Sequence, residues 1–233
     1  MQTYILSVGG SIFSLSDDLL FDIQKARSLK SLLKTYTDNG DKFVLSMGGG
    51  YICRKYQKIL KEEGFEDKEL DNVGVATINT NAVILRAVMG DLASEKVLRY
   101  EDFQSEEPLN FDKPIIVAAA SHPGHSSDWN AVKLAIRTGS TSLINVSNTT
   151  GVYDSDPKEN PNAKFLPEIT WDQYFEIVGN PTDFVPGAHF PFDIMAARMA
   201  KDNNISCYMV DGRDFINLEN LLNNQQFTGT LIH

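Results

Sequence analysis

The sequence predicts an α/β protein built on an open, mostly parallel and twisted sheet with helices on both faces. Short apolar runs rich in β-branched residues alternate with stretches of helical periodicity. Parallel strands need long crossover connections, and the helical stretches supply them. The chain has 233 residues, of which 42% are hydrophobic, which is enough for one sizeable core.

Five runs have the length and composition of buried strands. Each is short, apolar and partly β-branched, and the next segment brings glycine or small polar residues. The predicted strands are Tyr4–Val8, Phe43–Met47, Ile115–Ala119, Leu143–Val146 and Ser206–Val210.

Helices are expected between these strands because apolar residues recur there at helical spacing. Three such sets share a face: Tyr56, Ile59 and Leu60; Ile78, Ala82, Leu85 and Val88; and Phe192, Met195, Ala196 and Met199. The segment Asp154–Pro167 is rich in Asp, Asn and Pro and is expected to be a long surface loop. This segment is a candidate hinge between two halves, but the composition does not change enough to indicate a domain boundary, so we expect a single domain over residues 1–233.

The net charge restricts the binding partners, and the cysteine content indicates the redox compartment. The formal net charge of −10 disfavours nucleic acid and anionic membranes, which both attract a basic face. Cys53 and Cys207 lie far apart without metal-ligand spacing, which is typical of free thiols in a reducing compartment. The first residues, Met1–Val8, resemble a strand and not a signal peptide, so we expect a cytoplasmic protein.

Glycines and small polar residues follow four of the predicted strands. They form Gly9-Gly10-Ser11, Gly48–Gly50, the stretch SHPGHSSD at 121–128, and Ser147–Gly151. Ligands of open parallel sheets bind beyond the carboxyl ends of the strands, where helix N-termini attract anions. Several such segments at one edge of the sheet predict a binding site for several phosphate groups. Neither G-x-x-x-x-G-K-[ST] nor G-x-G-x-x-G is present, which disfavours a P-loop enzyme and a Rossmann dehydrogenase.

The stretch SHPGHSSD admits three interpretations. A metal site would use His122 and His125, for which Asp128 and His189 are the only further candidate ligands. A serine nucleophile with a histidine base would lack the G-x-S-x-G elbow. A turn that offers backbone N–H groups and the hydroxyls of Ser126 and Ser127 to an anion accounts for more of these residues.

Five segments together resemble one family. They are VGGSI at 8–12, MGGGYICRKY at 47–56, SHPGHSSD at 121–128, NTTGVYDSDP at 148–157 and PFDIMAARMA at 191–200. In this order they resemble the amino acid kinase superfamily and, within it, the uridylate (UMP) kinases of the archaeal type. The resemblance implies the family's α/β/α sandwich, with an acceptor-binding N-terminal part and an ATP-binding C-terminal part.

The resemblance also implies a role for individual residues. The expected catalytic residues are Gly10, Ser11 and Asp128, with Asp128 organising the active centre. The expected ATP-binding residues are Gly9, Gly10, Ser11, Gly50, Arg54, Ser147, Asn148, Tyr153 and Asp156. The expected UMP-binding residues are Gly49, Asp71, Ser121, His122, Pro123, Gly124, His125, Ser126 and Ser127. Mg²⁺ is expected to bind together with ATP and to have no protein metal site of its own. The assembly is expected to be a homohexamer built from dimers.

The resemblance predicts transfer of the γ-phosphate of ATP to UMP in pyrimidine nucleotide synthesis. One alternative is another small-molecule kinase of the superfamily. A second is a non-catalytic nucleotide- or oxyanion-binding protein of the same fold, because Tyr51 and Thr150 depart from the family's pattern. Arg198 is a further departure from that pattern.

Overall fold

The structure is a computed structural model that describes residues 1–120, 122–157, 159–179 and 190–233. Its centre is a seven-stranded sheet in the order β3-β2-β1-β4-β8-β9-β7. The strands are β1 (Thr3–Val8), β2 (Lys42–Met47), β3 (Ile115–Ala118), β4 (Ser142–Ser147), β7 (Glu168–Ile169), β8 (Ser206–Asp211) and β9 (Gly229–Ile232). All neighbouring pairs are parallel except β8 and β9. The predicted open, mostly parallel sheet is therefore confirmed.

The strand order reverses between β1 and β4. From β1 the chain proceeds outward through β2 to β3, and it then returns to place β4 on the other side of β1. In doubly wound sheets this switch point opens a crevice at the carboxyl ends of the strands. In the register of the pair, Ser7 lies opposite Asn145, close to that crevice.

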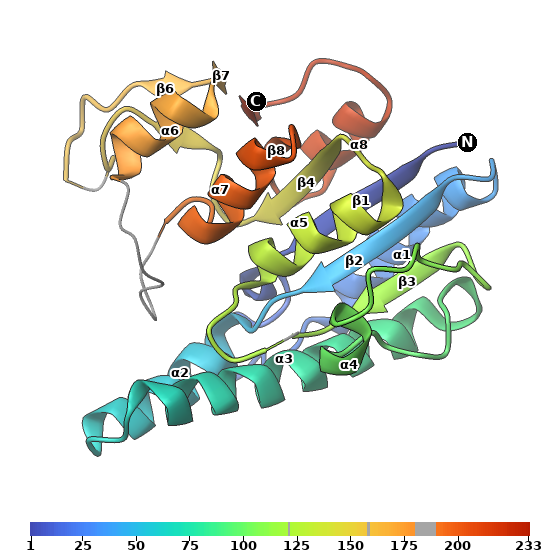
Figure 1. Cartoon of the computed structure of the whole chain (residues 1–233), viewed down its shortest axis with the longest axis horizontal. Helices are drawn as coiled ribbons and strands as arrows, with labels where there is room; N and C mark the ends of the chain where they lie inside the picture. The colour runs from blue at the N-terminus through green and yellow to red at the C-terminus, as the bar shows by residue number, and fades with distance from the viewer. Residues whose placement is uncertain (121, 158, 180–189) are drawn as a thin grey trace.

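Helices cover both faces of the sheet (Figure 1). They are α1 (Ile23–Thr37), α2 (Gly50–Glu62), α3 (Asp67–Met89), α4 (Tyr100–Phe103), α5 (Ser127–Thr138), α6 (Trp171–Val178), α7 (Ile194–Asp202) and α8 (Ile216–Leu222). Short 3₁₀ turns occupy Gly10–Ile12 and Gly90–Leu92. Figure 1 shows α5 and α7 in front of the sheet and α1 and α8 behind it, and two separate apolar clusters fill these two layers.

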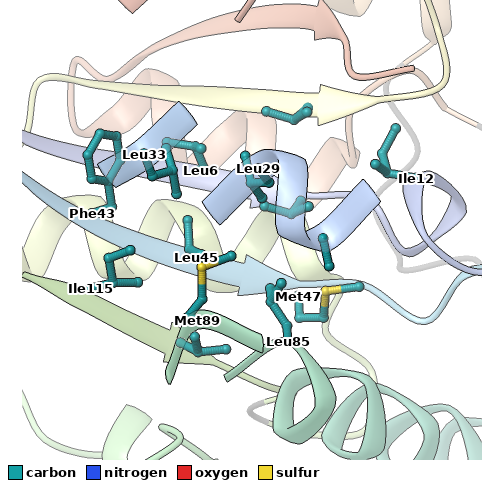
Figure 2. Close-up of a cluster of buried hydrophobic side chains, with 14 of the residues drawn as sticks. Leu6, Ile12, Leu29, Leu33, Phe43, Leu45, Met47, Leu85, Met89 and Ile115 are labelled. Carbon is teal, nitrogen blue, oxygen red and sulfur yellow. The ribbon is translucent and has the colours of Figure 1, made fainter. Parts of the chain in front are cut away.

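The two clusters together show why the strands are apolar on both faces. In Figure 2, Leu6 and Leu45 of the strands meet Leu29 and Leu33 of α1 and Leu85 of α3, all on one face of the sheet. The second cluster packs residues of α5, α6 and α7 on the opposite face of the sheet. A strand with helices on both of its faces has no polar face, which explains the continuous apolar runs in the sequence.

Two of the three predicted helical faces pack into the core. Ala82 and Leu85 of α3 are fully buried, and so is Ala196 of α7. In the third set, however, Tyr56 and Ile59 of α2 are 47% and 48% exposed. This helix packs beside α3 and projects with it away from the sheet (Figure 1), so its apolar residues do not reach the core.

The predicted loop Asp154–Pro167 is partly a β-hairpin. β5 (Val152–Tyr153) pairs antiparallel with β6 (Phe165–Leu166). The hydroxyl of Thr230 on β9 donates to the Leu166 carbonyl and accepts from the Val152 N–H at 2.9 Å. This side chain fixes the hairpin to the main sheet.

The helical stretch Asp67–Leu92 has the length and mean hydropathy, 1.3, that a membrane span requires. Core helices of globular domains meet the same criterion, and Ala82, Leu85 and Met89 of this stretch are fully buried within the protein.

Candidate active site

Asp128 lies at the switch point between β1 and β4. Its Oδ1 atom accepts hydrogen bonds of 2.8 Å from both the Ser7 hydroxyl and the Asn145 amide. Its Oδ2 atom accepts a third, at 3.2 Å, from the backbone N–H of Asp193. Burial of the carboxyl group raises its pKa to about 6, because removal from water disfavours the charged form more than the three donors favour it.

The carboxyl group of Asp193 holds the N-termini of two helices beside Asp128. It caps α7 by accepting the Ala196 N–H at 2.8 Å, and it hydrogen-bonds the Ser126 hydroxyl. Ser126 in turn caps α5, since its oxygen accepts the Trp129 N–H at 3.1 Å. Burial raises the pKa of Asp193 as well. The two helix N-termini therefore meet at one place, where their partial positive charges favour an anion.

Gly9–Ser11 follows β1 and Gly48–Gly50 follows β2, and these two turns, which we call the glycine corners, are in close contact. A Cβ atom on Gly10 would lie 2.2 Å from the Gly50 nitrogen, and one on Gly50 would lie 2.5 Å from the Gly10 carbonyl oxygen. Gly50 also has a φ of +72°, which favours glycine. Asn81 of α3 supports this contact by donating to the carbonyls of Gly48 and Gly49, at 3.1 and 2.9 Å. The expectation that these two corners lie at one edge of the sheet is confirmed.

These corners offer backbone donors to a ligand. Within Gly9–Ser11 and Gly48–Gly50, four N–H groups have no acceptor among the described residues, those of Gly10, Ser11, Gly49 and Gly50. They belong to the first turn of a 3₁₀ helix and to the N-terminus of α2. Unpaired N–H groups at helix N-termini bind phosphate oxygens.

The stretch after β3 forms a tight turn over residues 122–125. The His125 N–H donates to the His122 carbonyl at 3.3 Å, and Gly124 has a φ of +84°. Proline and glycine at the two central positions, with positive φ at the second, are typical of a type II turn. Asp71 of α3 accepts a hydrogen bond from the Gly124 N–H, and desolvation raises the pKa of this carboxyl group. The structure thus brings Asp71 to the predicted acceptor loop; Ser121 lies outside the described residues.

The histidines of this turn take part in a series of aromatic contacts. The His125 ring stacks on Trp129 with a centroid distance of 3.8 Å and an interplanar angle of 13°. The His122 ring lies 5.6 Å from His125 and 5.4 Å from Tyr100. In the described part of the chain no group of three or more His, Cys, Asp or Glu side chains could hold a metal ion, and His189 lies outside that part.

The predicted ATP-binding residues follow β4 on the other side of the crevice. The Ser147 carbonyl accepts the Gly212 N–H at 2.8 Å, which joins the ends of β4 and β8. Asn148 is exposed beside it. Tyr153 lies on β5 against Phe165, and Asp156 is exposed in the hairpin that follows.

Arg54 lies on the exposed side of α2, one turn after Gly50. Its neighbours have partners, since Lys55 pairs with Asp17 and Lys58 with Glu62. For Arg54 the structure shows no ion pair within the described residues. A cation near a helix N-terminus is unfavourable to the helix dipole unless an anion lies between them. Arg54 therefore has the position and the unpaired charge that a phosphate ligand requires.

Sequence reasoning missed three members of the site: Ser7, Asn145 and Asp193. The first two lie inside predicted strands, where a polar residue resembles a tolerated exception. Their polarity within apolar runs was the available signal, because buried polar side chains need partners. Asp193 precedes a helix, where an aspartate usually indicates only a cap.

The comparisons with known proteins agree with this geometry. Residues 2–211 match the model of the amino acid kinase family. This chain belongs to that family. It is 32% identical to the uridylate kinase of Thermococcus kodakarensis over 98% of both chains, and 29% identical to that of Methanobrevibacter smithii over 95% of both.

A solved structure of the family shares the whole fold. The crystal structure of uridylate kinase from Archaeoglobus fulgidus covers 100% of both chains with a TM-score of 0.78 and 26% identity. The predicted family resemblance and fold class are both confirmed.

Proposed function

We propose that this chain is a UMP kinase that transfers the γ-phosphate of ATP to UMP and releases ADP and UDP. The observation that carries the proposal is that Asp128 joins β1, β4 and the N-terminus of α7 at the switch point, through hydrogen bonds from Ser7, Asn145 and Asp193. Relatives of nearly the same length bear the name uridylate kinase, which favours this function over another kinase or a non-catalytic binding protein.

Phosphoryl transfer requires that the protein position the two nucleotides and stabilise the negative charge of the transferred group. The attacking group is a phosphate oxygen, which is ionised near neutral pH, so no strong general base is needed. Phosphoryl transfer requires the two nucleotides in line and donors for the spreading charge. The N–H groups of Gly10, Ser11 and Gly50 and the guanidinium of Arg54 supply such donors. Asp128 acts as a positioning residue, since it joins β1 and β4 to the N-termini of α5 and α7.

In this proposal the acceptor and the donor bind on different sides of the crevice. UMP lies against Asp71, Gly49 and the loop from Ser121 to Ser127. The phosphates of ATP lie against the glycine corners and Arg54, and its nucleoside lies near Ser147, Asn148, Tyr153 and Asp156. The single domain is thus divided into an acceptor-binding N-terminal part and an ATP-binding C-terminal part.

Mg²⁺ would accompany ATP and neutralise charge on its phosphates. Mg²⁺ keeps several waters and is usually held by substrate phosphates and one or two carboxylates. In this proposal Mg²⁺ is bound through the phosphates of ATP, without a metal site made by the protein itself. We further propose that the enzyme serves pyrimidine nucleotide synthesis in the cytoplasm and assembles as a homo-oligomer, by resemblance a hexamer.

An assay of ADP release tests the function directly. Purified protein with Mg²⁺ and ATP is given UMP, dUMP, CMP, AMP, acetylglutamate or carbamate as acceptor. The expected result is turnover with UMP that exceeds turnover with the other acceptors and stops when EDTA is added. Turnover with a non-nucleotide acceptor alone, or nucleotide binding without turnover, contradicts the proposal.

A further inference from the structure

Residues 122–125 are held from two sides. On one side the Asp71 carboxyl group accepts the Gly124 N–H. On the other side the His125 ring stacks on the Trp129 indole, nearly parallel and 3.8 Å away. The first contact involves a residue expected to bind the acceptor, whereas Trp129 belongs to none of the five motifs.

Trp129 is well fixed and can serve as a support. Its backbone N–H donates to the capping hydroxyl of Ser126 in the first turn of α5. The ammonium group of Lys133, one turn further along α5, lies 5.8 Å from the centre of the indole ring. The indole is therefore placed by a helix that itself begins at the switch point.

The His125 ring suits a stacked and desolvated position. Its Nδ1 atom is buried and has no hydrogen-bond partner among the described residues. Burial lowers the pKa of His125, and the nearby His122 and Lys133 lower it further. The imidazole is therefore neutral at neutral pH, and the stack joins two uncharged aromatic rings.

We propose that Trp129 is a positioning residue for the phosphate acceptor, which holds the turn of residues 122–125 in its binding conformation by stacking on His125. The inference rests on the proposed function, because it takes UMP as the ligand of this turn. Loss of the indole would remove one of the contacts that hold the turn, and the free energy of UMP binding would then include the cost of ordering it.

Steady-state kinetics of three variants test this role. Trp129→Leu removes the aromatic ring and is expected to raise KM for UMP about three- to tenfold, the range that one aromatic pair accounts for. KM for ATP should stay within about twofold. Trp129→Phe keeps a flat ring and should restore most of the affinity for UMP. Lys34→Ala removes an exposed lysine that pairs with Asp38 on α1, and it is the control with unchanged kinetics.

A double-variant comparison separates stacking from a general effect on folding. If the indole acts through the imidazole, Trp129→Leu combined with His125→Ala should raise KM for UMP no more than His125→Ala alone. Equal changes in both KM values, or losses that multiply in the double variant, would overturn the inference.

Fluorescence supplies a readout that does not depend on turnover. The chain has two tryptophans, so Trp171→Phe leaves Trp129 as the only indole. Saturating UMP is expected to change its emission, and ATP alone is expected to change it much less. Emission that does not respond to UMP contradicts the inference. If wild-type protein neither binds nor phosphorylates UMP, the proposed function fails and the inference fails with it. If wild type is active and Trp129→Leu has an unchanged KM for UMP, only the inference fails.

Discussion

The hydroxyl of Ser7 donates a 2.8 Å hydrogen bond to the carboxyl group of Asp128, although 121 residues separate them in the sequence. The contact joins the end of the first strand to the first turn of α5. Asn145, the register partner of Ser7 on β4, donates to the same oxygen. One carboxyl group therefore connects both sides of the switch point, and its removal should disturb the site more than the fold.

Asp128→Asn is expected to lower kcat at least about tenfold, or about 1.4 kcal/mol of barrier, with little change in Tm. The new amide would place its N–H₂ group against the Asp193 N–H, so that two donors face each other. This lowers the free energy of unfolding by about 1–3 kcal/mol. The variant also buries a neutral amide where the wild type buries a charge. This adds about 3 kcal/mol to the free energy of unfolding at pH 7 and offsets the loss. Asp172→Asn is the matched control, because Asp172 occupies the same position in the first turn of α6 but is exposed. If Asp128→Asn kept the wild-type kcat, Asp128 would only stabilise the N-terminus of α5, as an acidic residue in the first turn of a helix commonly does.

The raised pKa of Asp128 predicts how stability depends on pH. Its folded-state pKa is about 6 and its ordinary value is 3.8, so the folded protein holds this proton more tightly than the unfolded chain does. The stabilisation from this group is complete below about pH 4 and is lost as the pH rises to about 6. Urea denaturation between pH 4 and 7 should show wild type losing stability relative to Asp128→Asn over this window. Parallel curves for the two proteins would show that the carboxyl group titrates normally.

The interlocked glycines predict a large difference between two similar substitutions. Gly50 and Gly139 have nearly the same φ, +72° and +67°, so alanine costs about 1–2 kcal/mol of backbone strain at either position. At Gly139 nothing lies within 4 Å of the new Cβ, whereas at Gly50 the Gly10 carbonyl oxygen is 2.5 Å away. Thermal unfolding should therefore show Gly50→Ala to be clearly less stable than Gly139→Ala, and only Gly50→Ala should lose activity. Equal losses of stability would mean that the two corners do not touch.

Arg54 should affect the binding of ATP more than that of UMP. Its guanidinium offers a planar pair of donors to phosphate oxygens, which lysine cannot reproduce. Arg54→Lys is expected to raise KM for ATP, and Arg54→Ala should raise it further, with a smaller change in KM for UMP. Lys58→Ala on the same helix is the control, because Lys58 is exposed and pairs with Glu62. Unchanged dependence on ATP in Arg54→Ala would mean that backbone donors alone hold the phosphates.

Several elements could be predicted from the sequence because they depend on local rules. Runs such as Phe43–Met47 are recognisable as strands, since a strand buried on both faces must be apolar throughout. Pro123 and Gly124 indicate a turn by themselves, because their preferred backbone angles differ from those of other residues. The apolar face of α2 was not predictable in the same way: the spacing of Tyr56 and Ile59 indicates a helix but not what covers it.

The sequence by itself determined the order of strands and helices, the glycine corners and the motifs of the amino acid kinase family. These features follow from propensity, periodicity and the restricted angles of glycine and proline, which operate over a few residues. Only the tertiary structure decided that Ser7, Asn145 and Asp193 meet Asp128, and that Trp129 lies against His125. The physical reason is that strand order and register bring distant residues together. A hydrogen bond or a ring stack between two such residues places no requirement on the sequence that lies between them, so the sequence does not reveal it.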